Sequence, residues 1–286
     1  MKKGIIMLWA SALLCLMAGI TGCNNAKQAK TASGNGQEKN MAASPQVLTF
    51  DSIGTEQSDS IVEVKLSVQY PVSGPQVLVD SIRRYIAETL IVDQQWANDR
   101  DSLLAIAARK GYSTMKEDRD EIIADGIMGL PPFYYSFNIT KNCETDKYIT
   151  MNCGYEEFRG GPHGSFIATA TTIRKSDGKR MGWNMLTKTD TPEFRKLMIK
   201  GVRQYFEECG EKVESDEQLK DMLIIEGSVS NLPLPQAEPS LTPKGVAFCY
   251  QQYEIAAYAV GLPSFTISYA DIRPYLTDEA LELIEE

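Results

Sequence analysis

The sequence predicts an α+β fold, with a mainly antiparallel sheet and helices packed on one face of it. Segments in which apolar and polar residues alternate predict strands, because successive side chains of a strand point to opposite faces. Longer segments with apolar residues three or four positions apart predict helices. The strands follow one another as hairpins and the helices are grouped between them, which is typical of α+β proteins.

The first 22 residues have the pattern of a bacterial signal peptide that ends in a lipidation site. Lys2 and Lys3 precede an apolar run, Gly4 to Gly19, and this run is shorter than the roughly 20 residues that cross a membrane comfortably. Ile20-Thr21-Gly22-Cys23 then matches a bacterial lipobox. We expect cleavage before Cys23, followed by lipidation of its thiol and of its new amino group.

Two alternatives to this interpretation remain. Ala12-Leu13-Leu14-Cys15 is a competing lipobox, but its leucine just before the cysteine is too large for the peptidase. The segment could also be an ordinary signal peptide with a coincidental cysteine. With lipidation at Cys23, several acyl chains would make the membrane anchor effectively permanent.

Residues 23–46 are expected to form a flexible tether. They are rich in Asn, Lys, Ala, Ser, Gly and Gln, and Met41 is their only large apolar residue, so they cannot bury a core. A flexible coil of this length reaches roughly 25–30 Å. We therefore expect a folded part that works near a membrane in the bacterial envelope, facing the periplasm, with exposure at the cell surface left open.

The folded part begins near residue 47, and its periodic segments follow in chain order. The predicted strands are Ser60–Gln69, Phe133–Thr140, Lys147–Phe158, Phe166–Arg174, Arg180–Leu186, Gly245–Glu254 and Phe265–Tyr269. The predicted helices are Val77–Leu90, Asp101–Lys110, Thr114–Ala124, Pro192–Cys209, a short helix after Ser215, and the terminal turns Asp271–Leu276 and Thr277–Glu286.

Local signals support several of these boundaries. Asp101 or Ser102 can cap the second helix and Gly111 can stop it. Asp177-Gly178 is a two-residue hairpin signal, and Thr191-Pro192 places a capping residue before a proline at the first helical position. The double proline Pro131-Pro132 marks a boundary between two parts of the fold.

Charge and cysteine content narrow the classes of partner and site. Without Lys2 and Lys3 the chain carries 27 basic and 38 acidic residues, a net charge of −11. Nucleic acid is therefore a poor ligand, and a basic partner a better one, although acidity by itself also keeps proteins soluble. The mature chain would keep four cysteines, Cys143, Cys153, Cys209 and Cys249. They can form disulfides or remain as buried free thiols, and the sequence does not decide between these states. No spacing of Cys and His indicates a metal, and no motif indicates a cofactor.

A glycine-rich turn carries the only histidine of the chain. Tyr155-Glu156-Glu157-Phe158-Arg159 enters the turn, Gly160-Gly161-Pro162-His163-Gly164 forms it, and a strand leaves it. Gly supplies backbone angles that other residues avoid and Pro fixes φ near −65°. This pattern displays His163 at the end of a sheet.

Three motifs in this order resemble a known family. The glycine turn, the Asp177-Gly178 hairpin and the segment from Tyr253-Glu254 to Gly261 look like the domain of unknown function at the extracellular end of RsiV-type anti-sigma factors. Ala257 departs from that pattern, where proline is expected. The strand and helix between Ser60 and Leu90 more weakly resemble the domain that accompanies it there and in PdaC-type peptidoglycan deacetylases.

The resemblance implies a domain division and a binding function. After the signal peptide (1–22) and the tether (23–46), residues 47–132 would form a PdaC-like α+β part. Residues 133–286 would form an α+β domain like the C-terminal domain of RsiV-type proteins. The RsiV-type domain is a receptor for lysozyme, so the resemblance implies an envelope sensor or binding module. A lipobox leader leaves no cytoplasmic sigma-binding segment, and one histidine cannot supply the metal motifs of a deacetylase.

We therefore expect a lipid-anchored envelope protein that is not an enzyme and that binds a basic muramidase-type protein or a cell-wall fragment. Its binding surface is expected to include Arg159, His163, Tyr253 and Glu254. The first alternative is a cell-wall glycan hydrolase with His163 and Glu254 as acid and base. The second is a purely structural envelope lipoprotein. His163 can equally well hold its turn by bonding the backbone, and Glu254 can accept backbone hydrogen bonds.

Overall fold

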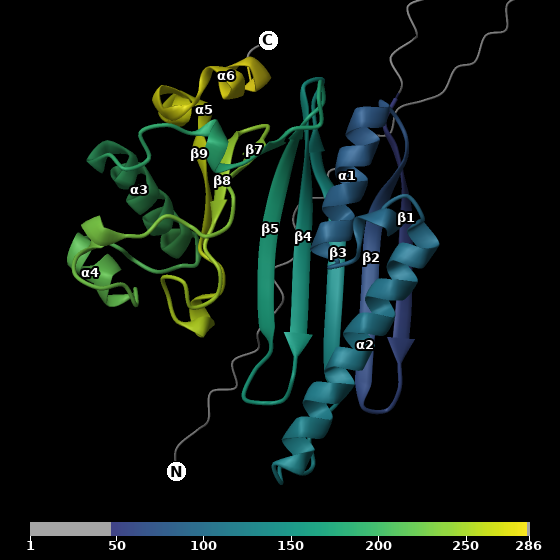
Figure 1. The fold of residues 1–286 in the computed structure, drawn as a ribbon. Coiled ribbons are helices and arrows are strands. Elements are labelled where there is room, and N and C mark those ends of the chain that lie inside the picture. Colours follow the sequence, from purple (N-terminus) through teal and green to yellow (C-terminus); the bar gives the residue numbers. More distant parts are fainter. Residues whose placement is uncertain (1–46, 285–286) are drawn as a thin grey trace, which may run out of the picture. The chain divides into compact units, whose positions relative to one another are not determined.

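The computed structural model describes residues 47–284 of the chain. The chain divides into two units, residues 1–43 and residues 44–286, and every described residue belongs to the second. The predictions for the signal peptide, the lipobox and the tether lie outside the described residues. The α+β fold class is confirmed: a large, mostly antiparallel sheet is combined with six α-helices in the described range (Figure 1). No helix within 47–284 is long and apolar enough to cross a membrane.

The large sheet has six strands in the order β1-β2-β3-β4-β5-β6. The strands are β1 (Thr49–Ser58), β2 (Val62–Ser73), β3 (Phe133–Glu144), β4 (Tyr148–Phe158), β5 (Ser165–Arg174) and β6 (Arg180–Met181). Neighbouring strands are antiparallel except β2 and β3, which run parallel in the register Val62 to Phe133. One sheet therefore continues across residues 132 and 133, where the sequence predicts a domain boundary, and the domain division itself stays a prediction.

Strand β1 is absent from the elements expected from sequence. It pairs antiparallel with β2 and forms the outer edge of the sheet. Its residues are exposed or half-buried throughout, so no row of apolar residues marks it in the sequence. The pairing partner, rather than a local pattern, makes this segment a strand.

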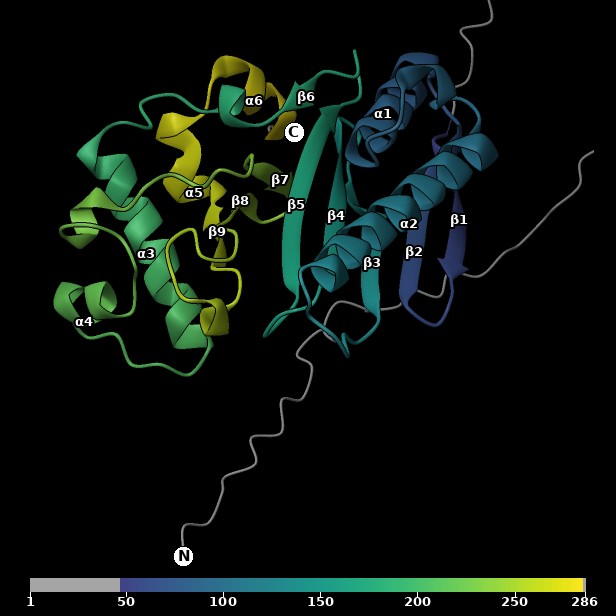
Figure 2. The same cartoon turned by 60° about the horizontal axis from the view of Figure 1, so that its bottom comes forward.

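Helices α1 (Gln76–Thr89) and α2 (Arg100–Ala124) cover one face of the large sheet (Figures 1 and 2). The first hydrophobic core lies between these helices and β2 to β5. Two separate helices were expected here, but α2 continues through Gly111 and is capped by Asp99. Gly111 does not end the helix because it allows a close approach: a Cβ at this position would lie 2.9 Å from the Tyr135 ring.

A second, three-stranded sheet has the order β7-β8-β9. Its strands are β7 (Ser240–Thr242), β8 (Gly245–Cys249) and β9 (Ser264–Ser268). Helix α3 (Pro192–Glu208) packs on it, most extensively on β9 (Figure 2), and encloses the second hydrophobic core. The strand expected over 245–254 ends at Cys249, because Gln251 to Glu254 form the turn described below.

The remaining helices lie around the second core. The expected caps of α3 and α4 are confirmed, with Thr191 accepting a hydrogen bond from the Phe194 amide and Ser215 from the Gln218 amide. The other α-helices are α4 (Asp216–Asp221), α5 (Tyr269–Ile272) and α6 (Asp278–Ile284). The 3-10 turns of this part are η2 (Trp183–Met185), η3 (Val229–Asn231), η4 (Tyr258–Val260) and η5 (Arg273–Tyr275), whereas η1 (Gln94–Trp96) lies between α1 and α2 beside the first core.

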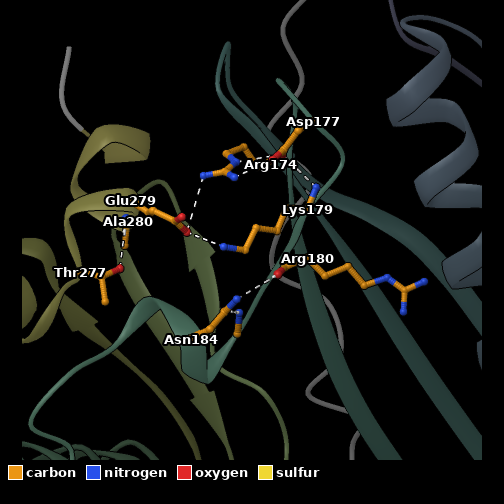
Figure 3. Close-up of polar contacts among 9 residues, drawn as sticks. Arg174, Asp177, Lys179, Arg180, Asn184, Thr277, Glu279 and Ala280 are labelled. Atoms are coloured by element: carbon orange, nitrogen blue, oxygen red, sulfur yellow. Dashed lines mark hydrogen bonds and ion pairs between the residues drawn. The ribbon is translucent and has the colours of Figure 1, made fainter.

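The predicted hairpin at Asp177-Gly178 joins β5 to β6 and contacts the C-terminal helix (Figure 3). Arg174 pairs with Asp177 at 2.6 Å, and Lys179 pairs with Glu279 of α6 at 2.6 Å. The strand expected to run from 180 to 186 is wrong beyond Met181, since the chain turns into η2 at Trp183. The short strand leaves most of the outer edge of β5 without a neighbouring strand.

Three residues join the two sheets at the level of β7. Thr150 and Thr172 are fully buried, and the Thr150 hydroxyl donates to the Leu241 carbonyl at 2.8 Å. The Leu241 amide donates to the Thr172 hydroxyl oxygen at 2.8 Å. Because the Thr150 hydrogen is already used, the 2.9 Å contact between the hydroxyls requires Thr172 to donate to Thr150. These bonds form a closed chain between β4, β5 and β7.

Candidate functional site

The glycine turn between β4 and β5 positions His163. Gly160 and Gly161 have φ values of 78° and 107°, which favour glycine. Gly164 lies close to the backbone, and a Cβ there would be 2.7 Å from the Glu157 carbonyl oxygen. The turn therefore requires its glycines for conformation and for close approach, and it leaves His163 exposed at the end of the sheet.

The segment Gln251-Gln252-Tyr253-Glu254 lies against the free edge of β5. The Gln251 side chain accepts from the Ala168 amide at 3.1 Å and donates to the Ala168 carbonyl at 2.9 Å. The Gln252 side chain accepts from the Phe166 amide at 2.9 Å. Two glutamine side chains thus take the place of a neighbouring strand, satisfying edge groups that would otherwise remain open.

These glutamines position the candidate site, and the sequence interpretation missed them. Their only local signal is a pair of amide side chains directly after a strand, and that pattern does not name a partner. The docking nevertheless decides the site, because it brings Tyr253 to the glycine turn from 90 positions away in the chain.

His163 and Tyr253 meet directly. The Nε2 atom of His163 lies 2.9 Å from the Tyr253 hydroxyl, and its Nδ1 atom lies 2.9 Å from the Gly164 carbonyl oxygen. Since the carbonyl can only accept, Nδ1 carries the hydrogen, and a neutral ring then accepts from the tyrosine at Nε2. The Tyr258 ring stacks on the imidazole, with centroids 3.7 Å apart and planes 21° apart.

Tyr253 is held in an uncommon conformation. Its φ is 63°, in the left-handed region that bulky residues rarely occupy, and 53% of its surface is exposed. A residue in this conformation persists where its surroundings hold it in place. Here the Gln251 and Gln252 contacts hold the backbone, and His163 holds the hydroxyl.

Glu254 is turned away from His163 and holds the backbone of its own loop. One carboxylate oxygen accepts from the Gln236 amide at 2.7 Å, and the other accepts from the Gln251 amide at 2.7 Å. The carboxylate therefore links the loop before β7 to the loop after β8. It supports the position of Tyr253 rather than reaching the imidazole.

Arg159 is directed toward α2. Its Nε atom bonds the Glu157 carboxylate at 2.6 Å, and its Nη1 atom pairs with Asp118 of α2. Partial burial lowers the pKa of Arg159, and the Tyr155 hydroxyl donates to the same Glu157 carboxylate. Of the four residues expected to form the binding surface, the structure joins His163 to Tyr253, with Glu254 behind them and Arg159 on the helix-covered side.

The chemistry of this junction suits binding by hydrogen bonds and stacking. Both ring nitrogens of His163 and both oxygens of Glu254 already have partners. Within residues 47–284, no group of three or more His, Cys, Asp and Glu side chains is arranged to hold a metal ion. Cys143, Cys153, Cys209 and Cys249 form no disulfide among the described residues, but Cys209 is exposed rather than buried, so the choice between disulfides and buried free thiols stays a prediction. Burial raises the pKa of Cys153 and of Cys249 to about 11.

A polar cleft of about 850 Å³ lies beside this junction, between the two sheets. One wall is the face of the large sheet opposite α1 and α2, with Asn138, Thr140 and Asn152. The other wall is the small sheet, with Ser264 and Thr266. None of these five side chains has a hydrogen-bond partner among the described residues. Their amide and hydroxyl groups both donate and accept, which suits polar ligands.

The comparisons with known proteins point to one family. Residues 190–270 match the family model described as "Protein of unknown function (DUF3298)". The match covers less than a third of the chain. The matched segment runs from the residue before the α3 cap to α5, so it contains Tyr253 and Glu254 and excludes Arg159 and His163. A search of curated proteins found no match.

Solved structures of DUF3298 proteins share the fold. A member of the family from Bacteroides fragilis is 17% identical, with a TM-score of 0.68, over 84% of this chain and 98% of that one. A DUF3298 family protein from Pseudomonas aeruginosa is 14% identical, with a TM-score of 0.53, over 83% of this chain and 97% of that one. The likeness in fold therefore extends beyond the segment that matches the family model to most of the large sheet. The RsiV-type and PdaC-type assignments go further than these matches.

Proposed function

We propose that this protein is a lipid-anchored binding module of the bacterial envelope that recognises a basic, muramidase-type protein. The observation that carries the proposal is the junction of His163 and Tyr253, which makes one exposed surface from two loops far apart in the chain. Exposed aromatic rings held in place by hydrogen bonds are typical contact points in protein interfaces. The RsiV-type resemblance and the expected charge of −11 support a basic partner.

The geometry favours binding over hydrolysis. A hydrolase that used His163 and Glu254 would need the carboxylate available to the reacting atoms. Glu254 instead holds two backbone amides, and breaking these bonds would release the loop that carries Tyr253. The polar cleft beside the junction favours a cell-wall fragment as a second candidate ligand, since glycans present many hydroxyl groups.

Calorimetric titration of residues 44–286 with a lysozyme-type muramidase tests the proposal at two salt concentrations. The fragment contains both hydrophobic cores and all nine strands of the described range, so we expect it to fold. Binding that persists at high salt and inhibits the muramidase supports a receptor. Binding that vanishes with salt reflects only attraction between opposite charges, and absence of binding refutes the proposal.

Three variants test the surface. Tyr253→Ala and His163→Ala are expected to weaken muramidase binding, whereas Arg159→Ala is expected to weaken it less because Arg159 is directed toward α2. Unchanged affinity in the first two variants would show that the junction is purely structural. Turnover of labelled peptidoglycan that His163→Ala abolishes would favour the hydrolase.

Lipidation is tested separately in cells. We propose that Cys23 carries the lipid, so labelled palmitate should enter the full-length protein and Cys23→Ser should abolish the labelling. Cys15→Ser is the matched control and should leave the labelling unchanged. The reverse result would assign lipidation to the competing lipobox.

A further inference from the structure

A second hollow, of about 400 Å³, opens on the helix-covered face of the large sheet. Its floor is a cluster of three aromatic side chains, Tyr135, Phe137 and Tyr155. The ring centroids of Phe137 and Tyr155 are 4.8 Å apart, and those of Tyr135 and Phe137 are 5.3 Å apart. The cluster is only half-buried, so this apolar surface remains open to a ligand.

The hollow exists because the two helices cover this part of the sheet only partly. Helix α1 ends at Thr89, and α2 passes with Ala107 and Gly111, which have little or no side chain, on the wall of the hollow. At the rim, Ile91 is 66% exposed and Ile167 of β5 is 42% exposed. Exposed aliphatic side chains around an apolar hollow are typical of binding sites rather than of ordinary solvated surface.

The charges at the rim select the ligand. Arg159 is held by two carboxylates, those of Asp118 and Glu157, so these three side chains together carry one net negative charge and leave no positive charge for a ligand. Lys110 lies on the wall and its ammonium donates to the Ile91 carbonyl at 3.3 Å, with no carboxylate in ion-pair distance among the described residues. Lys110 is therefore the charged residue of the lining that is left without an opposite charge, and a ligand carboxylate can supply one.

We propose that this hollow binds an aliphatic carboxylate, with the hydrocarbon chain on the aromatic floor and the carboxylate on Lys110. Its volume lies within the roughly 300–1,000 Å³ typical of small-molecule sites. Each methylene that enters it should raise affinity about fourfold, until the hollow is full. The site is separate from the junction of His163 and Tyr253, and does not depend on the function proposed for that surface.

Calorimetric titration of residues 44–286 with hexanoate, octanoate, 1-octanol and octylamine tests the site. We expect octanoate to bind at one site, more tightly than hexanoate, and octylamine to bind least. Lys110→Gln should lower the affinity for octanoate about tenfold and leave the affinity for 1-octanol unchanged. Lys116→Gln is the matched control for the loss of one charge, because Lys116 is on the same helix but outside the hollow. This variant should bind octanoate as tightly as the wild type does.

A second pair of variants tests the location without disturbing a core. Ile167→Glu places a carboxylate at the rim and should abolish binding of octanoate and weaken binding of 1-octanol. Val72→Glu is the matched control, because Val72 is also a β-branched strand residue and is 39% exposed. The proposal is overturned if octanoate does not bind, if Ile167→Glu binds as tightly as Val72→Glu, or if Lys110→Gln weakens the acid and the alcohol equally.

Discussion

Replacing Thr172 by valine should destabilise the protein strongly, although the two side chains have nearly the same shape. The Thr172 hydroxyl accepts from the Leu241 amide at 2.8 Å and donates to Thr150. Valine keeps the packing but leaves the Leu241 amide buried without an acceptor, and an unsatisfied buried group costs about 1–3 kcal/mol. With the second lost bond, we expect a loss of about 2–3 kcal/mol in the free energy of unfolding.

Guanidinium unfolding of residues 44–286, followed by circular dichroism, measures this loss. The midpoint should fall at an unchanged m-value, and Tm should fall by roughly 4–12 °C for a domain of this size. Thr55→Val is the matched control, because the hydroxyl of this strand residue has no hydrogen-bond partner in the described range, and the substitution should change stability by less than about 0.5 kcal/mol.

A double-mutant cycle tests the closed chain of bonds itself. Thr150→Val and Thr172→Val each break the bond between the two hydroxyls, so the double variant should cost less than the sum of the single variants. A coupling of about 0.5–3 kcal/mol is expected for residues in one network. Strict additivity, or a Thr172→Val variant as stable as Thr55→Val, would refute the arrangement.

Three further predictions concern the hairpin and the thiols. Gly178→Ala should lower the free energy of unfolding, measured in guanidinium, by about 1–2 kcal/mol or more. The reason is that φ of Gly178 is 70° and a Cβ there would lie 2.8 Å from the Val77 carbonyl oxygen. A variant as stable as the wild type would contradict this geometry. Hydrogen bonds from Arg174 lower the pKa of Asp177 to about 2, so its carboxylate stabilises the fold above about pH 4, and this contribution is lost as pH falls toward 2. Tm of Asp177→Asn should therefore fall less steeply over that range, and parallel curves would disprove the effect. Cys209 is exposed and should react first with a thiol reagent, whereas Cys153 is buried and should react only after unfolding. If the fast phase of the thiol reaction persists in Cys209→Ser, this assignment of exposure is wrong.

Local sequence patterns were enough to predict most elements of the fold. The alternation in β2 and the amphipathic pattern of α3 predict their elements because half-buried strands and helices repeat with different periods. The same is true of the caps at Thr191 and Ser215, where a side chain bonds an amide three positions later. Signals of this kind depend on neighbours within a few residues.

The errors occur where distant contacts overrule those signals. Gly111 is a common helix-stopping residue, but here it remains helical because the Tyr135 ring requires the space that a side chain would fill. Strand β1 has no apolar row, and it exists because β2 offers an unpaired edge. The parallel pairing of β2 with β3 joins segments separated by two helices, which no local pattern indicates.

The sequence by itself determined which residues could form a site, whereas the tertiary structure decided which of them meet. The glycine turn and the single histidine are visible in the sequence, because backbone conformations closed to other residues require glycine. The meeting of His163 with Tyr253 is not visible, since it depends on two glutamines bonding the edge of β5 across some 80 residues. Glu254 and Arg159 are chemically suitable for a site, yet backbone amides hold the first and two carboxylates hold the second. Side-chain chemistry is a local property of the sequence, but its availability depends on partners that only folding brings within reach.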